Sequence, residues 1–172
     1  MADNDYPDKT LHAPWQSAAS MFDETWGYRA WQDRGCIENK VREKTRSLIN
    51  VVSRGGNYLL NIGPKGNGAV VDFEKEVLEQ VGDWLSRYGY AVYQTEASPF
   101  QEEFTWGEVT RKDNHLYLFL SGKYPADGKI TLQIPGYLLQ KGDGKMATYL
   151  QYGDEVVLTV PASATKINTY TY

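Results

Sequence analysis

The stretch Gly55–Pro64, which reads Gly-Gly-Asn-Tyr-Leu-Leu-Asn-Ile-Gly-Pro, changes its structural preference twice within ten residues. The two glycines can adopt positive φ and end a helix that precedes them. The apolar run from Tyr58 to Ile62 suits a strand that is covered on both faces, and Gly63-Pro64 forces a turn. This order of helix stop, buried strand and loop is typical of a strand in an α/β barrel.

Asn57 and Asn61 are the polar exceptions in this strand. A buried amide must find hydrogen-bond partners, and active sites of parallel barrels lie at the C-terminal ends of the strands. The two side chains could therefore serve a cleft, or they could simply hold neighbouring loops in place. From the residues alone, the second interpretation is favoured.

The residues on either side of this strand predict two strand–helix units. A short strand is expected over 14–19, followed by a loop over 22–28. Residues 38–53 have the apolar spacing of an amphipathic helix that closes at Gly55, and a second helix should start with Asp72 as its cap and end at Gly89. The first part of the chain is thus predicted to be α/β.

The pattern changes after Ser98-Pro99, where helical spacing gives way to short alternating runs. Turn residues separate these runs, among them Asp113-Asn114, Asp127-Gly128, a Gly-Asp-Gly turn over 142–144, and Gly153-Asp154. Such spacing is typical of an antiparallel β-sandwich. Strands are expected over 104–111, 115–121, 129–134, 147–152, 155–160 and 165–172. We therefore predict two domains, 1–97 and 98–172.

Composition excludes some classes of partner. The net charge of the 172-residue chain is −4, and its basic residues are scattered, so neither nucleic acid nor a membrane surface is an expected partner. No apolar run is long enough to span a membrane, and the polar first residues do not resemble a signal peptide. Cys36 is the one cysteine, so no internal disulfide is possible and the compartment stays undecided.

Four motifs follow one another along the first part of the chain: Pro14-Trp15, Thr25-Trp26-Gly27-Tyr28, the stretch 53–64, and Gly82-Asp-Trp84-Leu85 with residues 89–93. In this order they resemble the last third of the catalytic barrel of α-L-fucosidases, which are retaining glycoside hydrolases that release α-linked L-fucose. The remainder resembles the β-sandwich that follows the barrel in these enzymes, so that the likeness covers nearly the whole chain.

The resemblance implies a fold of which this chain holds a part. A (β/α)8 TIM barrel needs about 250 residues, and the two units here make up its C-terminal portion. The nucleophilic Asp and the fucose-binding histidines of the family have no matching position in this sequence. We therefore expect a C-terminal fragment that is inactive alone and that needs the missing N-terminal barrel segment as a partner.

The substrate implied by the resemblance is a fucosylated oligosaccharide or glycoconjugate. No cofactor or metal is expected, and His12 and His115 lie in contexts too unlike to suggest a metal site or a triad. The family resemblance favours a periplasmic, secreted or lysosomal location.

The resemblance assigns the family's acid/base to the residue after Trp15, which is Gln16 here. An amide can hydrogen-bond a glycosidic oxygen but cannot protonate it. Either another carboxylate donates the proton, or the rate on poor leaving groups is lost, or the protein binds fucose without cleaving it. Glu24 is the candidate substitute acid, with Asp23 beside it, although acidic loop residues are commonly just solvated.

Trp26 and Trp15 are the expected substrate-binding residues, because an indole ring at a barrel mouth can stack on a sugar. Trp26 could equally plug the end of the barrel. Arg54 is expected to lie on a solvated face at the end of its helix.

The predicted sandwich over 98–172 could also have a non-catalytic function. The sandwich could be a carbohydrate-binding module that presents exposed aromatic rings such as Trp106, Tyr124 or Tyr137, or it could only buttress the barrel. Its turns show no cluster of aromatic and amide residues, which favours the buttress.

Overall fold

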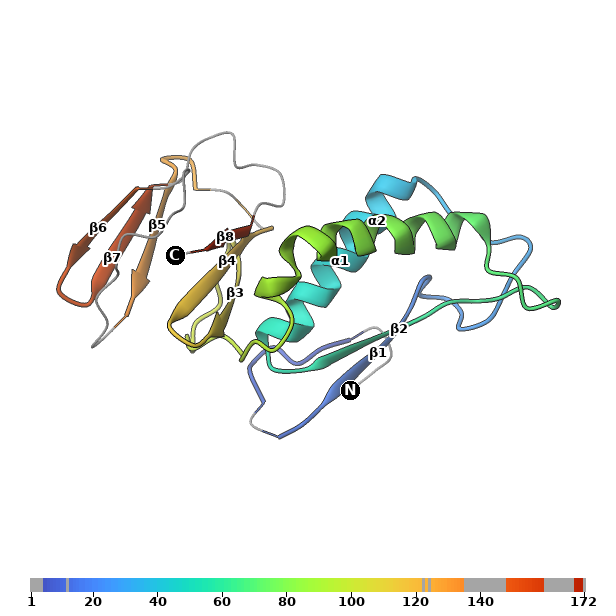
Figure 1. Cartoon of the computed structure of the whole chain (residues 1–172), viewed down its shortest axis with the longest axis horizontal. Coiled ribbons are helices and arrows are strands. Elements are labelled where there is room, and N and C mark those ends of the chain that lie inside the picture. Colours follow the sequence, from blue (N-terminus) through green and yellow to red (C-terminus); the bar gives the residue numbers. More distant parts are fainter. Residues whose placement is uncertain are drawn as a thin grey trace.

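The computed structural model describes residues 5–11, 13–121, 123, 125–134, 148–159 and 169–171, and of these 148, 149 and 169–171 by their backbone alone. The predicted turn over 142–144 lies outside the described residues. Along the long axis the elements form three groups: two helices over a pair of strands, then one three-stranded sheet, then another (Figure 1).

The first part is a β–α–β–α arrangement, as predicted. Strand β1 (Gln16–Ser20) runs parallel to β2 (Asn57–Asn61) with Gln16 opposite Asn57 and Ser20 opposite Asn61. Helix α1 (Ile37–Ser53) connects the two strands, and α2 (Asp72–Tyr88) follows β2 and passes into a short 3₁₀ turn, η1 (Gly89–Ala91). The strand–helix units expected from the sequence are confirmed.

Helix ends follow backbone conformation more than side-chain caps. Gly55 has a φ of 81°, as expected of a glycine that stops a helix, and its N–H donates to the Val52 carbonyl at 3.0 Å. The expected cap at Asp72 is wrong, because the cap position is Val71 and Asp72 is the first helical residue. Its carboxylate therefore acts only through the helix dipole.

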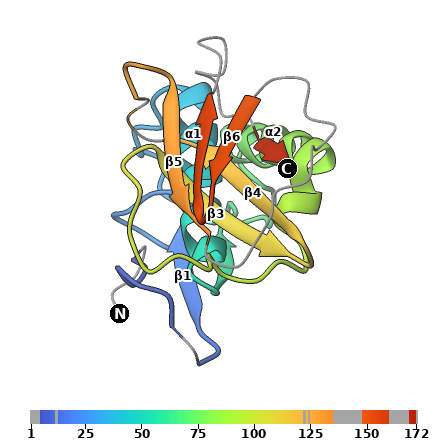
Figure 2. The same ribbon diagram turned by 90° about the vertical axis from the view of Figure 1, so that its left-hand side faces the viewer.

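The second part contains two antiparallel sheets. One has the order β3 (Gly107–Lys112), β4 (His115–Leu120), β8 (Thr169–Thr171), and the other has the order β5 (Lys129–Gln133), β7 (Glu155–Thr159), β6 (Thr148–Tyr152). Figure 2 views the second sheet and shows the first behind it. The six predicted strands are confirmed, with ends that differ by a few residues.

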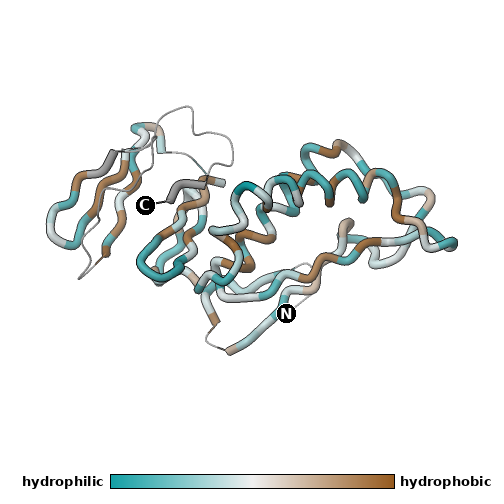
Figure 3. The backbone as a smooth tube through the Cα atoms, in the orientation of Figure 1, coloured by the Kyte–Doolittle hydropathy of each residue, from teal (hydrophilic) through white to brown (hydrophobic). Residues whose placement is uncertain are grey.

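Alternation along the strands creates the core between the sheets. Along β5 and β7, hydrophobic residues lie among hydrophilic ones (Figure 3), and every second residue, Ile130 and Leu132 in β5 and Val156 and Leu158 in β7, is buried. One core cluster takes residues from both sheets: Trp106, Val109, Leu118, Leu120, Ile130, Leu132, Ile134, Val156 and Leu158. The two sheets therefore pack face to face.

Strand β4 is covered on both of its faces. Its residues Leu118 and Leu120 belong to the core between the sheets, whereas Tyr117 and Phe119 pack with Ile49 of α1 and with the η1 region. The core of the helical part thus continues into the sheet across the expected boundary at residue 97.

Trp106 is not an exposed aromatic residue. It is 6% exposed and stacks on Phe104 with ring centroids 4.7 Å apart. The expectation that it presents a ring to a glycan is therefore wrong, because β3 and β4 place it inside the core. Tyr124 and Tyr137 lie outside the described residues.

Candidate functional site

The C-terminal ends of β1 and β2 lie side by side and carry the loops that follow them. The Met21 N–H donates to the Asn61 carbonyl at 3.0 Å, one residue beyond the last paired positions. Both loops extend to the end of the molecule farthest from the two sheets (Figure 1). In α/β proteins with parallel strands, ligands bind at this end.

Asn61 holds the loop over 22–28 against β2. Its side-chain amide donates to the Trp26 carbonyl at 2.6 Å. Gly63 lets the same loop approach closely, since a Cβ there would lie 2.8 Å from the Gly27 carbonyl carbon and from the Tyr28 nitrogen. The interpretation that Asn61 holds a neighbouring loop is confirmed. Asn57 is exposed, and its backbone N–H donates to the Trp15 carbonyl at 3.1 Å.

A tight turn in this loop presents Asp23 and Glu24. The Thr25 N–H donates to the Phe22 carbonyl at 3.3 Å, and the Thr25 hydroxyl accepts from the Gly27 N–H at 3.1 Å. Both carboxylates are exposed. Trp26, in the same loop, is 39% exposed.

Asp23 and Glu24 line a hollow of about 310 Å³ between this loop and the start of α1. Across the hollow, Glu43 lies between Lys40 at 2.8 Å and Lys44 at 2.7 Å. Burial raises the pKa of Glu43, but hydrogen bonds and charges from the two lysines outweigh it and hold the pKa below its ordinary value. Glu43 therefore stays ionised at neutral pH and is a poor proton donor.

A second hollow, of about 260 Å³, lies beside the first and shares Asp23 with it. Its lining includes Tyr58 and the buried Lys44. Burial raises the pKa of Tyr58 to about 12, and the Ser47 hydroxyl offsets part of that rise. The phenol is therefore neutral at physiological pH and is not a candidate base.

Gln16 and Trp15 lie at the opposite end of the strands from Trp26. Gln16 is the first residue of β1, four steps of roughly 3.3 Å, or roughly 13 Å, from Ser20 at the other end. Trp15 donates its indole N–H to the Arg54 carbonyl at 3.2 Å, and its ring covers Gly56, where a Cβ would lie 2.4 Å from it. The structure brings Glu24 and Trp26 into one loop and does not bring Gln16 or Trp15 to them.

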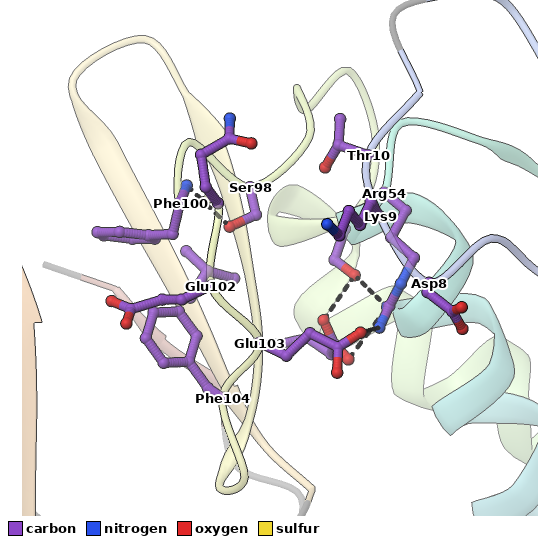
Figure 4. Close-up of a pocket in the computed structure, with 13 residues that line it drawn as sticks. Asp8, Lys9, Thr10, Arg54, Ser98, Phe100, Glu102, Glu103 and Phe104 are labelled. Carbon is purple, nitrogen blue, oxygen red and sulfur yellow. Dashed lines mark hydrogen bonds and ion pairs between the residues drawn. The ribbon is translucent and has the colours of Figure 1, made fainter.

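Arg54 is not on a solvated face, contrary to expectation. Its side chain is 12% exposed and pairs with Glu108 of β3 at 3.1 Å, while the Ser53 hydroxyl donates to the same carboxylate at 3.0 Å. Glu103 approaches at 4.0 Å from the segment that precedes β3, as Figure 4 shows. The cavity at this junction is about 40 Å³, enough for a water molecule but not for a sugar.

One residue with a structural role at this end of the strands, Glu74, was missed from the sequence. Glu74 is 3% exposed and accepts the Gly63 N–H at 3.0 Å, which anchors the turn after β2 to α2. Its spacing of three and seven residues from Val77 and Val81 places it on the apolar face of the helix and could have revealed it.

Among the described residues, no helix is long and apolar enough to cross a membrane.

Comparison with known proteins identifies relatives for both parts. Residues 1–90 match the family model of α-L-fucosidase. The rat tissue α-L-fucosidase is 38% identical over 126 residues, covering 70% of this chain and 26% of that protein. The human plasma α-L-fucosidase is 30% identical over 146 residues, covering 81% and 30% respectively.

The structural likeness extends further along the chain. The α-L-fucosidase of Vibrio sp. strain EJY3 superimposes with a TM-score of 0.82 at 26% identity, covering 99% of this chain and 31% of that one. The Thermotoga maritima α-fucosidase superimposes with a TM-score of 0.68 at 26% identity, covering 96% of this chain and 40% of that one. The chain spans about a quarter to a third of the length of the curated relatives it matches. From these matches and the motifs on β1, β2 and their loops, we conclude that the chain belongs to the α-L-fucosidase family.

Proposed function

We propose that the chain is the C-terminal part of a retaining α-L-fucosidase, with residues 1–97 forming the end of a (β/α)8 barrel and 98–172 the sandwich. The observation that carries the proposal is the parallel β1–α1–β2–α2 arrangement, with the Thr25–Tyr28 motif at the C-terminal ends of its strands. That is where a barrel enzyme keeps its site. The rest of the barrel and a fucosylated glycan are the partners this requires.

Retaining hydrolysis needs two carboxyl groups, one as nucleophile and one as acid and then base. A relative from Bacteroides thetaiotaomicron was trapped as a covalent intermediate in a glutamate-to-glutamine mutant, as expected when the second carboxyl group is lost. In our proposal the nucleophile belongs to the missing part of the barrel. This chain would contribute the second group.

We assign the proton donor to Glu24 in place of Gln16. Glu24 shares the loop of Trp26 at the C-terminal ends of the strands, whereas Gln16 begins β1 at the other end. An amide also has no acidic proton to deliver. Trp26 would stack on the sugar ring, and Trp15 would instead pack the start of the two strands.

Completing the barrel tests the function. The 172-residue chain, alone and fused to the N-terminal barrel segment of a family member, would be assayed on a natural fucoside and on an activated aryl fucoside. We expect activity in the fusion and none in the chain alone. A folded fusion that binds no fucose, or a chain active by itself, would contradict the proposal.

In the active fusion, Glu24→Gln should lower kcat/KM on the natural fucoside by about 10² to 10⁴-fold. The loss should be much smaller on the aryl fucoside, because its leaving group needs little protonation. Gln16→Glu is the matched control and should leave both rates nearly unchanged. A rate on the natural fucoside that rises in Gln16→Glu would return the acid/base role to position 16.

For the sandwich we propose a buttress. Tyr117 and Phe119 of β4 are buried against α1 and η1, and the Arg54–Glu108 pair joins the same two parts. The sheets also lie at the far end of the molecule from the Trp26 loop (Figure 1). Trp106 is buried and cannot present its ring to a glycan, which weakens the case for a carbohydrate-binding role of the sandwich.

For location, the relatives named as tissue and plasma enzymes support our proposal of a lysosomal or secreted protein.

A further inference from the structure

Trp31 has the largest exposed fraction, 72%, among the large hydrophobic side chains that the structure describes. It lies in the loop between β1 and α1, at the same end of the strands as Trp26 and Glu24. Exposed tryptophans are costly to solvate and are enriched where proteins bind ligands or partners. Neither proton donation by Glu24 nor stacking of fucose on Trp26 requires this ring.

The loop holds Trp31 in a defined place. The guanidinium of Arg34 donates to the Gln32 carbonyl and to the Arg29 carbonyl, both at 3.1 Å. The Gln32 N–H also donates to the Arg29 carbonyl at 3.3 Å, which closes a turn around Trp31. The guanidinium of Arg29 lies 5.3 Å from the centre of the indole ring. A ring that is positioned in advance loses little conformational entropy when a ligand stacks on it.

Trp31 does not itself line the hollow of about 310 Å³, but the lining includes Gln32, the next residue along the chain, together with Asp23 and Glu24 of the same loop. Its volume is at the lower end of the range for small-molecule sites. Its polar lining combines amides with carboxylates and can both donate and accept hydrogen bonds, as sugar hydroxyls require. The lining side chains of this kind are Asp23, Glu24, Gln32, Asp33, Asn39 and Glu43.

The charge of the hollow indicates which sugar fits. Four carboxylates line it against two basic side chains, and both basic groups are already engaged: Arg34 with backbone carbonyls and Lys40 with Glu43 at 2.8 Å. An anionic sugar would meet net repulsion. A neutral pyranose would not.

We infer that Trp31 and this hollow bind the sugar to which the fucose is attached, a neutral pyranose that stacks on the indole and hydrogen-bonds to the carboxylates and amides beside it. This inference rests on the proposed function, because it places the leaving sugar next to Glu24. Trp31 would then determine which glycans are accepted.

The test uses a fucose-free probe, so that its result does not depend on catalysis. The 172-residue chain, labelled with ¹⁵N and fused to the N-terminal barrel segment so that its barrel surfaces are covered, would be titrated with N-acetyllactosamine while the indole N–H signals are followed by NMR. We expect the Trp31 signal to shift, and Trp31→Ala to weaken binding, read from the remaining signals of the loop, by about tenfold. Trp31→Phe, which keeps a ring, should bind within about threefold of the parent chain.

Tyr152→Ala is the matched control, because Tyr152 is 67% exposed but lies on β6 in the far sheet. It should leave binding unchanged. No shift of the Trp31 signal, binding that persists in Trp31→Ala, or tighter binding of a sulfated N-acetyllactosamine would each overturn the inference. Absence of hydrolysis in the barrel fusion alongside normal probe binding would instead count against the proposed function.

Discussion

Arg54 shows how one side chain joins the two parts of this protein. Its guanidinium pairs with Glu108, its carbonyl accepts the Trp15 indole N–H, and its Cζ lies 5.1 Å from the Tyr6 ring centre. The side chains of Arg54 and Glu108 are 12% and 22% exposed, so water screens the pair incompletely.

Removing this charge should leave the Glu108 carboxylate without its cation. We expect Arg54→Met to lower the free energy of unfolding by about 1–3 kcal/mol, below the value for a fully buried pair because both groups keep some solvent contact. Urea denaturation measures the change. Lys75→Met is the control: its pair with Glu79 is 65% exposed on each side, and the change there should stay within about 0.5 kcal/mol. Equal changes in the free energy of unfolding for the two substitutions would show that the Arg54–Glu108 pair stabilises the protein no more than an exposed ion pair does.

Glycines have opposite roles in the two helices. Gly55 ends α1 with a φ of 81°, a conformation that costs any residue with a Cβ, and an added Cβ would also lie 3.4 Å from that of Ala97. Gly82 lies inside α2 on its exposed side, where an added Cβ meets nothing within 4 Å.

The two positions should therefore respond to alanine in opposite directions. Gly55→Ala should destabilise the protein by about 1–2 kcal/mol because of the positive φ. Gly82→Ala should stabilise it by about 0.5–1 kcal/mol through helix propensity. Thermal unfolding followed by circular dichroism compares the two, and a stabilising Gly55→Ala would mean that α1 can end without a left-handed residue.

Across the whole molecule, some strands are buried on both faces and others on one face only. Strand β4 is covered by helices on one face and by the second sheet on the other. The pair β1–β2 packs on the helices on one side, through Leu60 and Ile62, while Leu59 on the other side is 49% exposed. In a complete barrel this second side would face the interior.

We therefore expect the chain alone to associate. Among the described strands, β1 pairs with β2 alone, so its other edge is open. This edge and the Leu59 side of the sheet are surfaces that promote self-association. Size-exclusion chromatography with light scattering should show oligomers that shift toward monomer in Leu59→Ser. The barrel fusion, with these surfaces covered, should be monodisperse. A compact and stable monomer of the chain alone would contradict the idea that barrel strands are missing.

The local pattern was sufficient to predict the elements of this chain and its family. Glycine stops, the apolar run in β2 and the alternation after residue 98 depend on backbone preference and on the side-chain period, which act over a few residues. The motif order around Trp26 likewise needs no coordinates. The role of Asn61 in holding a loop could be predicted because Gly63-Pro64 marks the C-terminal end of the strand, where Asn61 lies next to the loops.

Placement across long distances in the sequence needed the folded chain. The parallel register puts Gln16 at one end of β1 and the Trp26 loop at the other, although they are ten residues apart. Arg54 pairs with Glu108, which is fifty-four residues away in the sequence. Trp106 is buried because the two sheets pack together over it. These outcomes depend on which surfaces come together when elements pack, and a pattern within one element carries no information about its partner.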